Sequence, residues 1–388
     1  MEFLKEELGN LKQQALYRQL KTMNAAQASR TIVNGKACIL LSSNNYLGLT
    51  EHPELKAAAK MAADLWGTGS GGSRLITGNM RLHEELEETI ARFKGTQAAI
   101  VFNTGYMANL GAITALVDRG DLIFSDELNH ASIIDACRLS QAKTMIYPHK
   151  NTDALEELLQ QNQGYRRVFI ITDGVFSMDG DLAPLPRLVE LAEQYNAWLM
   201  VDDAHATGVM GQRGAGTTEH FGLEGRVPIQ IGTLSKAIGS AGGFVAGSEE
   251  LIDYLRNKAR SFIYSTANPP SVIAVALAAF QVLQQNPQII ANLHGNAQYL
   301  RSGLKSIGFT ILTEESPVIP VLIGDTDKTM QMAQQLLDLG VFAPGIRPPT
   351  VPPGMSRLRV VVMATHTRED LDQALTAFTQ AGKHVGVI

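Results

Sequence analysis

The segment RVFIITDGVFSMDGDLAPLPRLVELAEQYNAWLMVDDAH, residues 167–205, decides the fold of this 388-residue chain. It begins and ends near short apolar runs of strand length, RVFIITD and AWLMVDD, and LPRLVELAEQYN between them has the apolar spacing of a helix. Strands that alternate with helices in this way predict a mostly parallel sheet with helices packed on it. Each run ends in aspartate, which places carboxylates at the edge of the sheet where open α/β proteins bind ligands.

The same alternation extends along the chain in both directions. From about residue 85, helical stretches alternate with the strand-like runs AAIVF, DLIFSD and AKTMIYP, and PIQIGT and GGFVAGS follow after residue 205. The pattern predicts a mostly parallel sheet covered on both faces. Two helical stretches at residues 289–306 and 327–339, with short strands such as VIPVLIG and RLRVVVM, predict a smaller C-terminal α+β domain.

Three regions follow from this pattern. The apolar spacing of residues 1–25 predicts an amphipathic helix. We therefore expect an N-terminal helix and arm at residues 1–47, a large α/β domain at 48–282 and the small C-terminal domain at 283–388.

Composition narrows the class of protein. The formal net charge is -5, with 45% hydrophobic and 18% charged residues and no long basic run, which argues against nucleic acid or an anionic membrane as the main partner. Cys38 and Cys137 form no CxxC motif, so neither a zinc site nor a disulfide framework is indicated, and no HExxH motif is present. The charged N-terminus lacks the apolar core of a signal peptide, and the run Val272 to Phe280 is too short to cross a bilayer. We expect a cytoplasmic protein without a metal site.

One lysine lies in an unusual setting. Lys236 is surrounded by small residues in GTLSKAIGSAGG, residues 232–243, which let backbone and side chain close on a flat ligand. Pyridoxal 5′-phosphate (PLP) needs a lysine for a Schiff base, an acid for its ring nitrogen and donors for its phosphate. Lys236 and Asp202 end neighbouring strand-like runs and fit the first two roles, and desolvation would lower the pKa of the lysine. The alternatives are a surface lysine in a glycine-rich loop and an aspartate that caps the next segment.

Other polar residues follow the same strand ends. The helix that begins at Gly105-Tyr106, with the hydroxyls of Thr233 and Ser235, could bind the phosphate. His130 could stack on the ring and His205 could contact its 3′-oxygen, although a lone histidine is more often structural. These residues predict one ligand site at one edge of the sheet.

Two further motifs leave alternatives open. GTGSGGSRLITG contains a GxGxxG match, but it follows a helix rather than a strand, so we reject a dinucleotide site and expect a mobile or ligand-approaching loop. In IRPPTVPPGMSRLRV, Arg347, Arg357 and Arg359 could grip a carboxylate or form surface ion pairs. Alternation along RLRV places Arg357 and Arg359 on the same face.

The chain resembles the α-oxoamine synthases, a family of fold-type I PLP-dependent transferases, over essentially its whole length. The matching segments are SSNNYLGL, GTGSGGSRLITGN, FNTGYMANLG, SDELNHASIIDACRLS, TDGVFSMDGDLAPL, VDDAHATGVMG, GTLSKAIGSAGG and IRPPTVPPGMSRLRV. The resemblance implies a large domain with a mostly parallel seven-stranded sheet, a smaller C-terminal α+β domain, and a homodimer whose active site lies at the interface.

The resemblance also implies residue roles. Lys236, His130 and Asp202 would be catalytic. The implied cofactor-binding residues are Gly105, Tyr106, His130, Ser177, Asp202, His205, Thr233, Lys236 and Thr266. Of these, Thr266 would reach across the dimer interface to the cofactor of the partner subunit. The implied substrate-binding residues are Arg359 with Asn44 for the amino acid's carboxylate and Arg18, Arg347 and Thr350 for the acyl substrate. Asp173 departs from the glutamate of many members, so we leave it out of the predicted site.

Within the family, GSGGSRLITG and RPPTVPPG most resemble the acyltransferases that join L-alanine to a pimeloyl thioester. The acyl carrier, coenzyme A or acyl carrier protein, stays open. The alternative is the branch that joins glycine to acetyl-CoA, and more distant alternatives are an aminotransferase or a non-catalytic protein of this fold.

Overall fold

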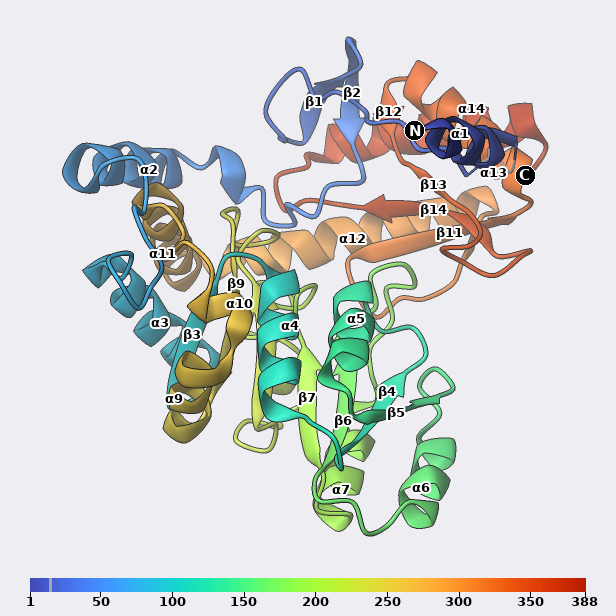
Figure 1. Ribbon diagram of the computed structural model, residues 1–388. Helices are drawn as coiled ribbons and strands as arrows, with labels where there is room; N and C mark the ends of the chain where they lie inside the picture. The colour runs from blue at the N-terminus through green and yellow to red at the C-terminus, as the bar shows by residue number, and fades with distance from the viewer. Residues whose placement is uncertain (14–15) are drawn as a thin grey trace.

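The computed structural model describes residues 1–13 and 16–388, and its largest element is a seven-stranded sheet (Figure 1). The strand order is β3-β9-β8-β7-β6-β4-β5. The strands are β3 (Ala98–Phe102), β4 (Leu122–Asp126), β5 (Lys143–Tyr147), β6 (Val168–Asp173), β7 (Trp198–Asp202), β8 (Ile229–Thr233) and β9 (Gly243–Gly247). From β5 to β8 all pairs are parallel, and β9 is antiparallel to both neighbours. The predicted mostly parallel seven-stranded sheet is confirmed.

Helices cover both faces of this sheet because successive strand residues point to opposite sides. Ile171 of β6 packs in one apolar cluster and Ile170 in another on the opposite face. The first cluster includes α4 (Gly105–Leu116), α5 (Ala131–Ser140), α9 (Glu249–Lys258) and α10 (Arg260–Ile263). The second includes α6 (Thr152–Gln161) and α7 (Leu185–Gln194). Further along the sheet, β3 and β9 pack with α2 (Pro53–Trp66), α3 (Arg81–Lys94) and α11 (Pro270–Gln285).

A smaller α+β unit follows the large sheet, as predicted. Its antiparallel sheet has the order β10-β11-β14-β13. The strands are β10 (Thr310–Ile311), β11 (Val318–Gly324), β13 (Gly345–Ile346) and β14 (Ser356–Val361), and the helices are α12 (Gln288–Ile307), α13 (Thr326–Asp338) and α14 (Arg368–Val385). In Figure 1 this unit lies above the large sheet, with β11 and β14 over α5.

The N-terminal arm joins the C-terminal part through a third sheet. Its strands are β1 (Arg30–Val33), β2 (Lys36–Leu40) and β12 (Val341–Phe342), and β2 pairs in parallel with β12. The short elements η1 (Leu49–Glu51) and α8 (Thr217–His220) complete the described secondary structure. The boundaries at residues 47 and 282 stay predictions. No helix among the described residues combines the length and apolar character that spanning a bilayer requires.

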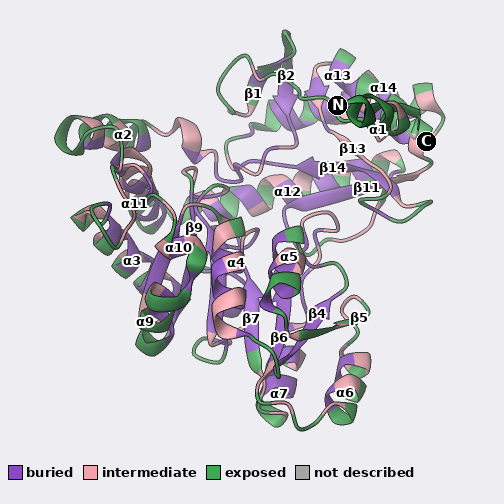
Figure 2. Cartoon of the chain, in the orientation of Figure 1, coloured by how far each residue is buried: buried purple, intermediate pink, exposed green. Residues whose placement is uncertain are grey.

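Two predictions about helices differ from the structure. The N-terminal helix α1 spans only Glu2–Gln13, and residues 16–22 lack helical structure. No residue of α1 is buried, as Figure 2 shows, so tertiary packing does not extend the helix beyond its first turns. Conversely, sequence analysis did not identify α14, although its capping box at Thr367 and Asp370 marks its start.

Candidate active site

The carboxyl ends of the central strands open into a cavity of about 240 Å³. The residues that line it are Thr104, Gly105, Tyr106, Asn109, His130, Ser132, Asp173, Ser177, Asp202, Ala204, His205, Thr233, Ser235 and Lys236. All the predicted cofactor residues except Thr266 lie in this lining. The rule that ligands bind beyond the carboxyl ends of parallel strands therefore selected residues that line one cavity, and their roles stay predictions.

Lys236 follows β8. Its Nζ atom is hydrogen-bonded to Nε2 of His205 at a distance of 2.9 Å. Burial lowers the pKa of Lys236 to about 8, although the Asp202 carboxylate opposes this effect. Burial, with the charges of Lys236 and Arg359, holds the pKa of His205 well below its usual range. A neutral His205 accepts from Lys236 at Nε2 and donates from Nδ1 to the Tyr46 hydroxyl, 2.7 Å away. Tyr46 was not predicted.

Asp202 ends β7 and is buried. Its carboxylate accepts hydrogen bonds from Asn109 Nδ2 at 2.6 Å and from the Ala204 amide at 2.8 Å. A buried carboxylate with two hydrogen-bond donors is held in one orientation, and Asp202 is among the residues that line the cavity. The sequence indicated Asp202, but not Asn109, which lies on α4.

Asp173 is a member of the site that sequence analysis omitted. It ends β6 beside Asp202, in direct register with it, and its Oδ2 accepts from the His130 amide at 2.7 Å. Burial and the neighbouring Asp202 carboxylate raise the pKa of Asp173 well above its usual value, which favours the protonated form. Burial also lowers the pKa of His130, with the Lys236 charge adding to this effect and Asp202 opposing it.

The same cavity is lined by hydrogen-bond donors suited to an anion, and we call this group the anion cradle. Helix α4 begins at Gly105, and the Thr104 hydroxyl caps it by accepting from the Met107 amide at 3.1 Å. The first amides of a helix carry no intrahelical partner and attract anions. The Thr233 hydroxyl lies 2.8 Å from the Ser235 hydroxyl. A Cβ at Gly105 would lie 3.4 Å from the Thr233 side chain, so the helix start and these hydroxyls are in close contact.

The cavity therefore contains the three kinds of group that PLP requires. The amine is Lys236, the carboxylate is Asp202, and the cradle joins the start of α4 to Thr233 and Ser235. The residues present fit the predicted cofactor.

Arg359 and Asn44 come together beside the cavity, as the resemblance implied. Arg359 is buried in β14 and donates from Nη2 to Asn44 Oδ1 at 3.0 Å and from Nε to the Ser177 carbonyl at 2.6 Å. Its charge helps to lower the pKa of both Lys236 and His205. The backbone carbonyl of Ser177 is thus bonded to Arg359, and the expected contact of Ser177 with the cofactor stays a prediction.

The remaining predicted residues lie outside the lining of this cavity in the single chain. Arg18, Thr266 and Thr350 are exposed and Arg347 is half-buried. The Thr266 carbonyl accepts from Asn103 Nδ2 at 2.8 Å, which places it next to the strand end before α4. The part of the chain that the structure describes does not test their roles.

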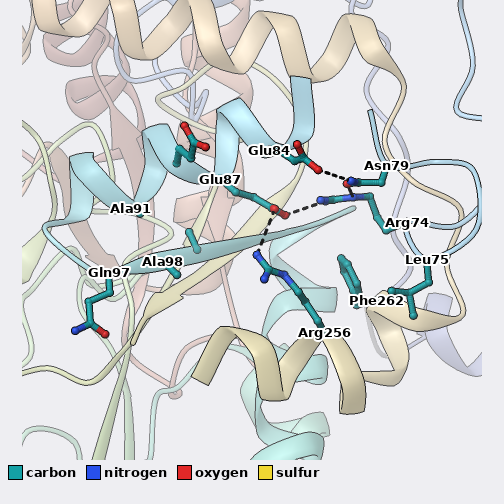
Figure 3. A pocket seen from close by; sticks show the side chains of 12 residues that line it. Arg74, Leu75, Asn79, Glu84, Glu87, Ala91, Gln97, Ala98, Arg256 and Phe262 are labelled. Atoms are coloured by element: carbon teal, nitrogen blue, oxygen red, sulfur yellow. Dashed lines mark hydrogen bonds and ion pairs between the residues drawn. The ribbon is translucent and has the colours of Figure 1, made fainter. Parts of the chain in front are cut away.

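A second cavity of about 420 Å³ lies between α3, β3 and α10 (Figure 3). Its central groups pair with one another. Arg74 Nη1 lies 2.9 Å from Glu87 Oε1, and the same carboxylate oxygen accepts from the Val101 amide. These contacts hold the glycine-rich loop of residues 67–80 against α3 and β3. The second cavity is larger than the first, but its lining has no comparable set of catalytic groups.

Comparison with known proteins identifies the relatives of this chain. The family model described as aminotransferase class I and II matches residues 36–378. The 8-amino-7-oxononanoate synthase of Thermoanaerobacter pseudethanolicus is 50% identical, with 100% of this chain and 98% of that protein covered. The enzyme of the same name from Symbiobacterium thermophilum is 51% identical, with 100% and 99% covered.

Solved structures agree with the sequence relatives. A serine palmitoyltransferase from S. paucimobilis with a bound PLP–myriocin aldimine superposes with a TM-score of 0.94 at 35% identity, covering 99% of this chain and 98% of that one. The 8-amino-7-oxononanoate synthase of Francisella tularensis superposes with a TM-score of 0.77 at 29% identity, covering 90% and 99%.

Proposed function

The chain belongs to the class I and II aminotransferase family and its α-oxoamine synthase branch, and we propose on this premise that it makes 8-amino-7-oxononanoate from L-alanine and a pimeloyl thioester. This decarboxylative condensation is a step of biotin biosynthesis. The observation that carries the proposal is identity of about one half, over the full length, to several synthases of that name. The chain is a PLP-dependent acyltransferase of fold-type I.

The residues of the cavity would hold the cofactor as follows. Lys236 would bind its aldehyde and Asp202 its ring nitrogen, while the start of α4 and Thr233 would hold the phosphate. His130 would lie against the ring, His205 would lie on the side of its 3′-oxygen, and Ser177 would contact the cofactor. When bound, PLP supplies an electron sink for a carbanion at the Cα atom of the amino acid.

The protein itself supplies orientation and proton transfer. Arg359, fixed by Asn44 and Ser177, would hold the alanine carboxylate through its remaining donors. This fixes which Cα bond faces the reacting centre, and positioning of this kind accounts for much of the rate in many enzymes. Lys236, whose pKa of about 8 makes its amine available near neutral pH, would take the Cα proton. Arg18, Arg347 and Thr350 would line the acyl side.

We extend the proposal to the assembly. A homodimer would bring Thr266 to the partner subunit's cofactor, and its exposure in the single chain supports this. The two free cysteines are both buried, which is compatible with a cytoplasmic location.

A substrate panel tests the function. The purified holoenzyme is incubated with L-alanine or glycine, each with pimeloyl-CoA, pimeloyl-acyl carrier protein or acetyl-CoA, and thiol release and carbon dioxide are measured. We expect turnover with L-alanine and a pimeloyl thioester, and none in Lys236→Ala. Preference for glycine with acetyl-CoA, or formation of a keto acid without thiol release, would contradict the proposal.

A further inference from the structure

We propose that Arg357 is a positioning residue, which orients Arg359 toward the substrate carboxylate by holding the hairpin of residues 174–183 through Asp179. The proposal rests on the proposed function in one respect, that Arg359 binds the carboxylate of the amino acid. Neither Arg357 nor Asp179 lines the catalytic cavity.

The hairpin of residues 174–183 follows β6. It contacts the end of β7 on one side and the small sheet on the other. At its base, the Gly174 amide donates to the carbonyl of Asp202 at 2.8 Å. Across the hairpin, the Phe176 amide donates to the Asp181 carbonyl at 3.0 Å, and the Gly180 amide donates to Phe176 at 2.7 Å. The base of the hairpin is therefore fixed to the residue that would bind the ring nitrogen.

The tip of the hairpin lies directly against the small sheet. Gly180 has a φ of 71°, and a Cβ there would lie 2.7 Å from the carbonyl oxygen of Val318 in β11. Any larger residue would push the tip away from the sheet. At the returning strand, the Leu182 amide donates to Glu315 Oε2 at 3.0 Å.

Two arginines from one face of β14 bind two residues of this hairpin, Ser177 and Asp179, which are separated by one residue. Arg359 donates to the Ser177 carbonyl, and Arg357 Nη1 lies 2.5 Å from Asp179 Oδ1. The Arg357 side chain is only 2% exposed, and Asp179 is the one carboxylate within ion-pair distance of it among the described residues. Its Nε also donates to the Met355 carbonyl at 3.0 Å.

Through the hairpin, the position of Arg359 depends on the ion pair of Arg357. They are two residues apart on a fully buried strand, so a shift of the hairpin moves the Ser177 carbonyl that fixes the Nε of Arg359. The Arg357–Asp179 pair fixes the hairpin two residues beyond Ser177. Loss of the pair should therefore misdirect the guanidinium of Arg359 while the cofactor residues on β7 and β8 keep their places.

The experiment measures amino-acid binding without the thioester. Holoenzyme variants Asp179→Asn and Arg357→Met are titrated with L-alanine, and the shift of the cofactor's absorbance band gives the dissociation constant. We expect that constant to rise by about 10-fold to 100-fold in both, since small misplacements of a positioning group cost on the order of 100-fold. Ethylamine, which is alanine without its carboxylate, should bind to the variants and to the unmodified enzyme equally.

Two further variants separate positioning from general damage. In an Arg359→Met background, Asp179→Asn should add no further loss of alanine affinity, because the residue through which it acts is gone. Arg167→Met removes an arginine from another buried carboxylate, Asp121 at 2.7 Å, which precedes β4 at the edge of the sheet opposite the site, and should leave alanine affinity unchanged.

The outcomes are distinguishable. Equal alanine affinity in Asp179→Asn, Arg357→Met and the unmodified enzyme overturns the positioning role alone. An equal loss in Arg167→Met, or an equal loss of ethylamine binding, also overturns it. If L-alanine, glycine and L-serine all fail to shift the band of the unmodified enzyme, the proposed function and this inference both fall.

Discussion

At Lys236, burial and neighbouring charge act in opposite directions on a single amine. Burial lowers its pKa from 10.5 to about 8, and the Asp202 carboxylate raises it. The fraction of free amine therefore increases with pH and reaches one half near pH 8 in the apoenzyme. We predict that the rate at which apoenzyme binds PLP, followed by stopped-flow absorbance of the Schiff base, rises through a midpoint near pH 8.

The Asp202→Asn variant provides the control for this prediction. Removing the carboxylate that raises the pKa of Lys236 should move the midpoint to lower pH, even though the cofactor is held less tightly. A midpoint near 10.5 in the unmodified protein would show that the amine is solvated and would contradict the assignment.

Some residues of the site could be predicted from the sequence and others could not. Lys236, Asp202 and His205 follow strand-like runs, and parallel strands deliver their carboxyl ends to one edge, so a list of strand ends predicts them. Tyr46 and Asn109 belong to a loop and to a helix surface, and their contacts depend on how distant segments pack. Asp173 was excluded on a family pattern, although its register with Asp202 places it in the lining.

At the scale of elements, a buried ion pair fixes the turn that follows β7. Lys94, the last residue of α3, lies 2.8 Å from Asp203 Oδ2, and the two side chains are 0% and 1% exposed. Lys94 also donates to the Ala215 carbonyl, and Thr217 donates to Asp203 at 2.5 Å. The pair thus binds α3 to the turn that carries Asp203 and His205.

We predict that Lys94→Met destabilises the protein by about 3–5 kcal/mol, because it leaves a buried carboxylate without its cation. The measurement is urea unfolding of the holoenzyme. The double variant Lys94→Met/Asp203→Leu should recover much of the loss, since no unpaired charge remains. The surface pair Arg226–Glu193, 43% and 54% exposed, is the matched control, and Arg226→Met should leave the unfolding midpoint nearly unchanged. Equal effects at the two sites would contradict the argument.

The helices and strands that are well buried were the ones that the sequence pattern predicted best. Strands of the large sheet are nearly continuous apolar runs because both faces are covered, so their existence and order along the chain could be predicted. Their spatial order could not, since it depends on tertiary packing, and β12 and β13 are too short to show a periodic signal. The extent of α1 was wrong because an amphipathic pattern predicts a helix only where something packs on it.

At the scale of the whole molecule, large apolar side chains are exposed in the segments that meet around Thr266. Thr266 forms a bridge with Ser73, and its carbonyl accepts from Asn103. Large side chains of the same segments are exposed: Trp66 43%, Leu75 55%, Ile76 78%, Tyr106 43% and Tyr264 74%. Several large apolar side chains exposed in neighbouring segments are typical of a subunit interface. We therefore expect twice the 42.0 kDa chain mass in solution, measured by light scattering.

Complementation between two inactive variants tests whether Thr266 acts across that interface. Lys236→Ala removes the amine, and Thr266→Trp would block the partner subunit's cofactor, so each variant alone should be inactive. In a mixed dimer, the site of the Thr266→Trp chain has its own lysine and receives Thr266 from the other chain. Random mixing by co-refolding or subunit exchange makes half of the dimers mixed, with one intact site each, so about a quarter of the normal activity should return. If Thr266 acted within its own chain, both sites of the mixed dimer would stay inactive and no activity would return.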